Sequence, residues 1–250
     1  MPAPDNDARP IRPERSFRIA RPTRPVRVQS AARTARCTHR ARSFIRAFVA
    51  CVVILASAQT ADAQAKPDAL KMYQNGRFEE ARTTCLAELS QDPTNIESYV
   101  VLVWSLLALE RYSDAELYAN KAYTTVRRDP RIVEALGEAA YYLGKNETAL
   151  QRFRDYVNLL PDGARIGTVY YLSGETYLRL DKLEHADIAM RTALQYEPNN
   201  ARWWSRLGYV RERASDWINA LEAYDAALAI NPGLADAKSG RERVVARSRR

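Results

Sequence analysis

The chain has 250 residues, of which 46% are hydrophobic and 27% are charged, a balance typical of a folded soluble protein rather than a disordered or fibrous one. Its nine glycines and the lack of long β-branched alternation favour helices over strands. The net charge of +8 does not indicate nucleic-acid binding by the folded part. Residues 1–46 hold twelve arginines against three acidic residues and carry +9, which leaves −1 for the rest.

Residues 1–43 form a basic leader that is predicted to be disordered. Arginine recurs at every third position from Arg9 to Arg27 and is mixed with prolines. Two interpretations stay open for this stretch. It is either an arm that binds anions, or a segment upstream of the true start codon that is never made, and the second interpretation is favoured.

Residues 44–65 are predicted to be a secretory signal peptide. The apolar run AFVACVVILASA at 47–58 follows Arg42 and Arg46, and Ala63-Gln64-Ala65 fits the small-residue cleavage site before Lys66. The run is shorter than the roughly 20 residues that a membrane-spanning helix needs. We therefore expect cleavage, no transmembrane span in the mature chain, and a protein exported to the periplasm or associated with the envelope.

A pattern with a period of 34 residues runs through residues 66–234. In four copies an alanine is followed by a larger side chain four residues later and by proline twelve residues later: Ala81, Cys85 and Pro93; Ala149, Phe153 and Pro161; Ala186, Met190 and Pro198; Ala220, Tyr224 and Pro232. A fifth copy, with Ala115 and Ala119, has Pro130 instead. The predicted units are 62–95, 96–129, 130–163, 167–200 and 201–234.

These residues resemble the tetratricopeptide repeat, in which each unit is a helix-turn-helix. The last unit carries most of the family's signature: Trp204, Leu207-Gly208, Trp217, Ala220, Tyr224, Ala227 and Pro232. The resemblance implies an all-α fold, a right-handed superhelical solenoid of about five repeats. Residues 235–250 are expected to add a C-terminal capping helix and a basic tail.

No catalytic or metal-binding constellation is visible after the leader. Cys85 is the only cysteine there, and it occupies the same slot as Tyr224, so a buried and unreactive thiol is expected. His185 is expected on the solvent side of a helix. No phosphate-binding glycine loop is present. We therefore expect no enzymatic activity, no cofactor and no metal.

The resemblance also implies a binding surface, because ligands of this family usually lie in a concave groove formed by the first helix of each repeat. Carried onto this chain, the groove is aromatic and acidic in its middle, with arginines toward one end. Its predicted residues are Trp104, Glu134, Glu138, Tyr141, Tyr142, Tyr171, Glu175, Arg179, Arg202, Tyr209 and Glu212. Rings beside carboxylates suit a partner with basic and apolar side chains.

The resulting interpretation is a non-catalytic adaptor of the cell envelope that binds a protein or peptide in this groove. The alternative is a small-ligand-binding accessory protein of an envelope transport system. The charge of −1 outside the leader disfavours a nucleic-acid partner. Self-association through Trp203 and the outer helix faces stays open.

Overall fold

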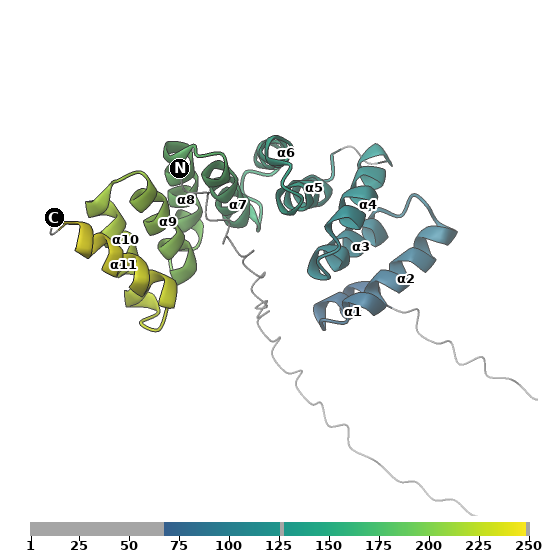
Figure 1. Ribbon diagram of the computed structural model, residues 1–250. Helices are drawn as coiled ribbons and strands as arrows, with labels where there is room; N and C mark the ends of the chain where they lie inside the picture. The colour runs from purple at the N-terminus through teal and green to yellow at the C-terminus, as the bar shows by residue number, and fades with distance from the viewer. Residues whose placement is uncertain (1–67, 126–127, 249–250) are drawn as a thin grey trace, which may run out of the picture. The chain divides into compact units, whose positions relative to one another are not determined.

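The computed structural model describes residues 68–125 and 128–248, and these residues form helices and no strand (Figure 1). The predicted leader and signal peptide lie outside the described residues. The helices are α1 (Ala69–Gln74), α2 (Phe78–Gln91), α3 (Ile96–Ala108), α4 (Tyr112–Thr125), α5 (Pro130–Tyr142), α6 (Asn146–Leu159), α7 (Ile166–Arg179), α8 (Leu183–Tyr196), α9 (Ala201–Arg213), α10 (Trp217–Ile230) and α11 (Ala235–Ser248).

The helices form five consecutive pairs, from α1/α2 to α9/α10, and α11 follows the last pair. We call the first member of each pair its A helix and the second its B helix. Each helix packs against the helices before and after it in the chain, and α3 also contacts α5, which contacts α7 (Figure 1). This is the all-α solenoid of five helix-turn-helix repeats with a capping helix that the 34-residue pattern predicts.

Proline sets the end of most B helices. α2, α6, α8 and α10 each end two residues before a proline, at Pro93, Pro161, Pro198 and Pro232. Proline lacks the N–H that would continue the helical ladder, and it disfavours helical backbone at the residue before it. The prolines of the repeat pattern therefore account for where these four B helices end.

The turn between the two helices of each pair has a left-handed residue at the same register in every repeat. These residues are Gly76, Glu110, Gly144, Asp181 and Ser215, with φ between 56° and 76°. Glycine adopts this backbone without steric cost, whereas a side chain there is strained. The shared turn makes the A and B helices antiparallel neighbours in all five repeats.

Small residues on the A helices let the B helices approach closely. A methyl group on Gly208 would lie 2.8 Å from the ring of Tyr224, and one on Gly137 would lie 2.6 Å from the ring of Phe153. Cys85, in the slot equivalent to Tyr224, is fully buried, and burial raises the pKa of its thiol to about 12. The cysteine is therefore a core residue, as predicted.

Candidate functional site

The predicted groove residues lie on the A helices α3, α5, α7 and α9, but their exposure differs widely. Glu134, Tyr141, Tyr171 and Glu175 are buried, with at most 7% of each residue exposed. Trp104, Glu138, Tyr142, Tyr209 and Glu212 are half-buried, and Arg179 and Arg202 are exposed. Most of the predicted groove residues are therefore packed against neighbouring side chains, and only Arg179 and Arg202 are exposed to solvent.

Two of the predicted glutamates share one arginine. Arg165, the residue before α7, donates from Nε to Glu134 at 2.8 Å and from Nη2 to Glu138 at 2.7 Å. The Glu134 side chain is 2% exposed and that of Glu138 is 13% exposed. One guanidinium therefore balances two carboxylates in a site with little access to water, and this cluster carries one unit of excess negative charge.

The excess charge changes the protonation of the cluster. Burial raises the pKa of Glu138 to about 7, Glu134 adds to this increase, and Arg165 opposes it. Burial also raises the pKa of Tyr73 on α1, whose hydroxyl lies within electrostatic reach of Arg165, Glu138 and Glu134. The first repeat therefore contributes a ring to the surroundings of the cluster formed by the third and fourth.

The other two predicted carboxylates are each held by a fork of two hydrogen bonds. Arg206 on α9 donates to both oxygens of Glu175, at 2.7 and 2.6 Å. Arg243 on α11 donates to both oxygens of Glu212, at 2.7 and 2.8 Å, and the Tyr224 hydroxyl also donates to Glu212. Bidentate pairs of this kind are strong and geometrically specific, so Glu175 and Glu212 serve to join adjacent repeats.

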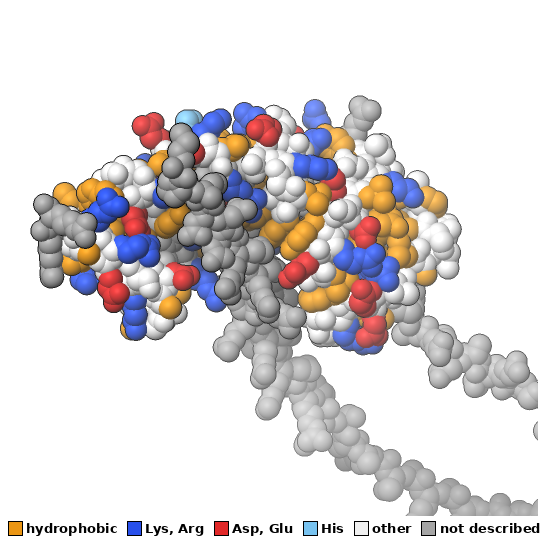
Figure 2. Space-filling model, viewed as in Figure 1, with side chains coloured by type: hydrophobic (Ala, Val, Ile, Leu, Met, Phe, Trp, Pro, Cys, Tyr) orange, Lys and Arg blue, Asp and Glu red, His pale blue; other side chains and the backbone are white. Residues whose placement is uncertain are grey.

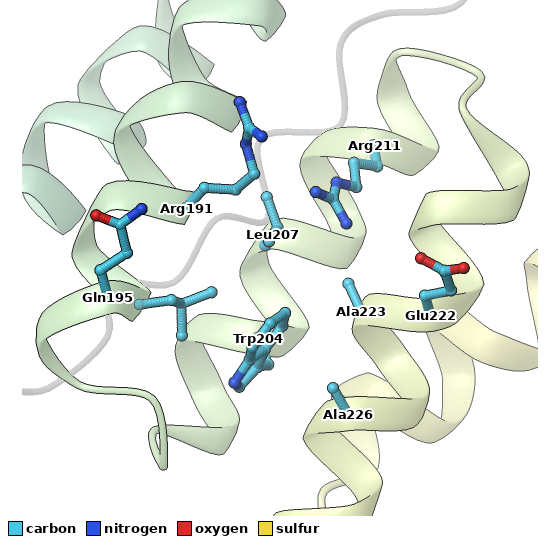
Figure 3. Close-up of a pocket in the computed structure, with 9 residues that line it drawn as sticks. Arg191, Gln195, Trp204, Leu207, Arg211, Glu222, Ala223 and Ala226 are labelled. Atoms are coloured by element: carbon cyan, nitrogen blue, oxygen red, sulfur yellow. The ribbon is translucent and has the colours of Figure 1, made fainter.

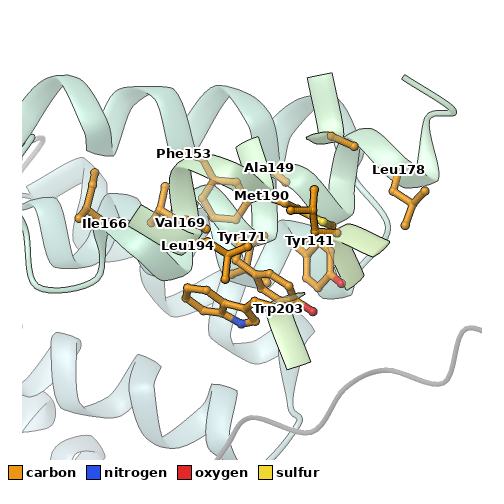
Figure 4. Packing of buried hydrophobic residues seen from close by; sticks show 14 of the residues in the cluster. Tyr141, Ala149, Phe153, Ile166, Val169, Tyr171, Leu178, Met190, Leu194 and Trp203 are labelled. Atoms are coloured by element: carbon orange, nitrogen blue, oxygen red, sulfur yellow. The ribbon is translucent and has the colours of Figure 1, made fainter. Parts of the chain in front are cut away.

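The aromatic residues make stacks of their own. The ring of Tyr171 lies parallel to that of Trp203, with centroids 4.9 Å apart (Figure 4). Tyr142 stacks on Tyr112 at 4.4 Å, and its ring lies 5.0 Å from that of Tyr141. Trp203 is 8% exposed, so it is a core residue of α9 and is not available for the self-association suggested by its sequence position.

Three further predicted residues are held in place by neighbouring rings or side chains. The Arg179 guanidinium lies 3.8 Å above the Tyr141 ring and donates to the Tyr141 carbonyl oxygen at 2.6 Å. The Arg206 guanidinium lies 5.2 Å from the centre of the Tyr209 ring. Trp104 packs beside Tyr73, with ring centroids 5.7 Å apart.

The arginines that hold the glutamates were missed by the sequence reasoning. Arg206 and Arg243 lie 31 residues after their glutamates, and Arg165 lies 27 and 31 residues after Glu138 and Glu134. A spacing of 31 is one repeat of 34 residues minus about one helical turn. A search for an arginine 31 residues after each predicted glutamate would have found all three pairs.

Two hollows lie elsewhere in the described residues, between consecutive B helices. The first has a volume of about 430 Å³ and is lined by Trp204, Leu207 and Arg211 from α9 together with residues of α8 and α10 (Figure 3). The second, about 320 Å³, has Tyr170, Ser173 and Tyr177 from α7 at the equivalent register, between α6 and α8. The two hollows are the same groove one repeat apart.

The surface of the described residues mixes charges of both signs with hydrophobic side chains (Figure 2). His185 is exposed, as expected, and its ring lies 5.2 Å from that of Tyr177. The described residues contain no group of three or more histidine, cysteine or acidic side chains placed to share a metal ion. None of the helices in residues 68–125 and 128–248 is long and apolar enough to cross a membrane.

Comparison with known proteins agrees with the repeat pattern. Residues 171–235 match the family model described as "Tetratricopeptide repeat". Among curated proteins, the peroxisomal targeting signal receptor of Kluyveromyces lactis is 27% identical over 159 residues, which cover 60% of this chain and 26% of the receptor. The matched part of this chain spans about a quarter of that relative's length.

Several solved structures share the fold at lower identity. The pilF protein of Pseudomonas aeruginosa superposes with a TM-score of 0.62 at 19% identity, covering 70% of this chain and 79% of that chain. MamA of Desulfovibrio magneticus gives 0.60 at 19% identity, covering 67% and 93%. YrrB, described as having an unusual peptide-binding site, gives 0.59 at 18% identity, covering 70% and 88%.

Proposed function

We propose that the chain is a protein–protein interaction adaptor that binds one segment of a partner protein along its A helices. The match of residues 171–235 to the tetratricopeptide repeat model and the shared fold of YrrB support this proposal. The observation that carries this proposal is the cluster of Glu134, Arg165 and Glu138. When Glu134 and Glu138 are both ionised, it leaves one negative charge uncompensated on the A-helix face, beside half-buried rings. YrrB, which shares the fold, is described as a peptide-binding protein.

A basic side chain of the partner would balance this charge. Burying a carboxylate costs free energy unless it is paired with a cation. Among the described residues, Glu138 forms an ion pair only with Arg165, and Arg165 also pairs with Glu134. A lysine or arginine entering beside Glu138 would meet the rings of Tyr142 and Tyr73, which also favour a cation. Apolar side chains next to it would pack on Trp104. The partner segment therefore carries basic and apolar residues.

The proposal also includes the compartment. The signal-peptide pattern at 44–65 supports export, so that the adaptor would work in the periplasm or at the envelope. The mass of the protein isolated from cells tests this part. A chain that begins at Lys66 supports export, whereas a chain that retains the apolar run at 47–58 contradicts cleavage.

The test of partner binding is cross-linking of the full chain in its own cells, beside the variant Glu138→Gln. The variant keeps the size of the side chain but removes the excess negative charge, so we expect the cross-linked partner to be lost or reduced at least tenfold. Glu147→Gln, an exposed glutamate of the same repeat on the B helix α6, is the matched control and should retain the partner. Equal capture by both variants would place binding elsewhere on the protein.

A second candidate function is the binding of a small ligand between B helices. It is favoured by the hollow of about 430 Å³ over Trp204, which lies within the size range of ligand sites, about 300–1,000 Å³ (Figure 3). Native mass spectrometry of the full chain, purified under gentle conditions, distinguishes the two functions. A co-purified molecule that is lost on Trp204→Ala supports this candidate, and a clean apo mass argues against it.

A further inference from the structure

We infer that the same face has a second subsite of opposite charge, formed by Arg179 and Arg206 beside Tyr141, which takes an acidic side chain of the partner. This inference rests on the proposed function, because it names a further group that the bound segment must carry. The sequence-based expectation placed acidic and aromatic residues in the middle of this face and arginines toward one end, without a separate positive subsite.

Arg179 is held in position without being neutralised. Its guanidinium lies over the Tyr141 ring, with the central carbon 3.8 Å from the ring centroid, and Nη1 donates to the Tyr141 carbonyl oxygen. Within the described part of the chain, no carboxylate forms an ion pair with Arg179, and the residue is exposed. Its charge is therefore held on a fixed platform and stays accessible to a partner.

Arg206 lies close to the same platform. Glu175 accepts from its Nε and Nη2, so the fork is fixed in orientation and Nη1 is left over. The hydroxyl of Tyr141 lies within electrostatic reach of Glu175, Arg179 and Arg206 together. Two guanidinium groups and one carboxylate surround this tyrosine, so the local balance is one positive charge.

A buried donor without a partner borders the same cluster. The Tyr171 hydroxyl is buried and makes no hydrogen bond within the described residues, and Glu175 and Arg206 both lie within electrostatic reach of it. An unpaired buried hydroxyl is costly. A carboxylate of the partner that binds Arg206 would bring a hydrogen-bond acceptor toward the Tyr171 hydroxyl. The cluster therefore offers positive charge and hydrogen-bond donors, which is the chemistry that recognises a carboxylate.

The two subsites of opposite sign meet at neighbouring residues. Tyr141 belongs to the positive cluster, and Tyr142 lies within reach of Glu138 and Arg165 in the negative cluster. The two rings are 5.0 Å apart. An extended segment advances about 3.3 Å per residue. A bound segment would therefore place its basic and acidic side chains within about four residues of each other.

The experiment selects partners without knowing the natural one. A library of random 12-residue peptides, displayed on phage through their C-termini so that no terminal carboxylate is free, is panned against the full chain. We expect the enriched peptides to share a basic and an acidic position at a fixed short spacing. The same library is panned against Arg179→Glu, Glu138→Gln and the control Arg154→Glu, an exposed arginine on α6.

Each of the two test variants should change one position of the selected peptide sequence, and the control should change none. Arg179→Glu should replace the acidic position by a basic one, Glu138→Gln should remove only the basic preference, and Arg154→Glu should leave both unchanged. If the acidic position is absent, or survives Arg179→Glu, the second subsite is wrong and the adaptor function is untouched. If no peptide is enriched, or neither groove variant changes the selection, the proposed binding face is wrong as well.

A synthetic peptide of the selected sequence separates a side-chain carboxylate from a terminal one. With an amidated C-terminus it should bind as tightly as with a free one, and replacing its acidic residue by glutamine should weaken binding about tenfold. Binding only by the free-acid form would overturn the inference in favour of a terminal carboxylate.

Discussion

At the scale of single residues, Glu138 is the side chain whose charge is most open to change. Its pKa of about 7 in the folded protein is far above the ordinary value near 4.5, because the carboxyl is buried next to Glu134 and the two carboxyls have one cation, Arg165, between them. The folded state therefore binds a proton between pH 4.5 and 7 that the unfolded state has released. This group makes the protein less stable as the pH rises through that window.

The variant Glu138→Gln tests this assignment. It should flatten the dependence of the free energy of unfolding on pH between about 4.5 and 7, so that wild type and variant differ more at pH 7.5 than at pH 4.5. Urea denaturation of both proteins across this range measures the difference. Parallel curves for the two proteins would show that Glu138 titrates near its ordinary pKa.

Residue-level prediction from sequence succeeded where one position decides the outcome. The slot shared by Cys85 and Tyr224 is buried in both repeats, because a residue facing the partner helix at that register has no route to water. It did not place Trp203, for which self-association was left open and which the structure buries. Whether that indole is exposed depends on Tyr171 in the preceding repeat, and a local pattern does not record which side chains of neighbouring repeats meet.

At the scale of helices, the repeats are joined by ion pairs between consecutive A helices. The pair of Glu175 and Arg206 is the clearest case, because Glu175 is almost fully buried and both of its oxygens are used. The variant Arg206→Met should lower the free energy of unfolding by about 2–4 kcal/mol, since it leaves a buried carboxylate without a partner. Chemical denaturation measures the loss.

A second substitution distinguishes the ion pair from simple packing. Adding Glu175→Leu to Arg206→Met removes the stranded charge, so the double variant should recover most of the lost stability. If the two effects instead add, the arginine contributes through its hydrocarbon stem and the pair itself is unimportant. The alanine–proline period predicted the repeat units. It did not predict the ion pairs between repeats, because these depend on how far one A helix is shifted along the next.

At the scale of the whole described chain, α11 closes the last repeat. Ala237 and Val244 of α11 are buried against Tyr224, and Arg243 holds Glu212. Deleting residues 235–250 should uncover this cluster and lower the stability of the adjacent repeat first, because each repeat of a solenoid depends mainly on its neighbours. Hydrogen exchange should show amide protection falling in α9 and α10 and unchanged in α3 and α4. A uniform fall would indicate that the stack unfolds as one cooperative unit.

The ion pairs between repeats share one direction along the chain. In each of the following the acidic residue comes from the earlier repeat and the basic residue from the later one: Glu97 and Arg131, Glu116 and Lys145, Glu134 and Arg165, Glu175 and Arg206, Asp187 and Arg211, Asp225 and Arg241, Glu212 and Arg243. From the second repeat onward, each boundary is therefore a complementary joint between an acidic rear face and a basic front face. α11 covers the rear face of the fifth repeat, because Arg241 and Arg243 pair with its Asp225 and Glu212. Without this cover the rear face would present unpaired carboxylates, the kind of head-to-tail surface from which open filaments grow.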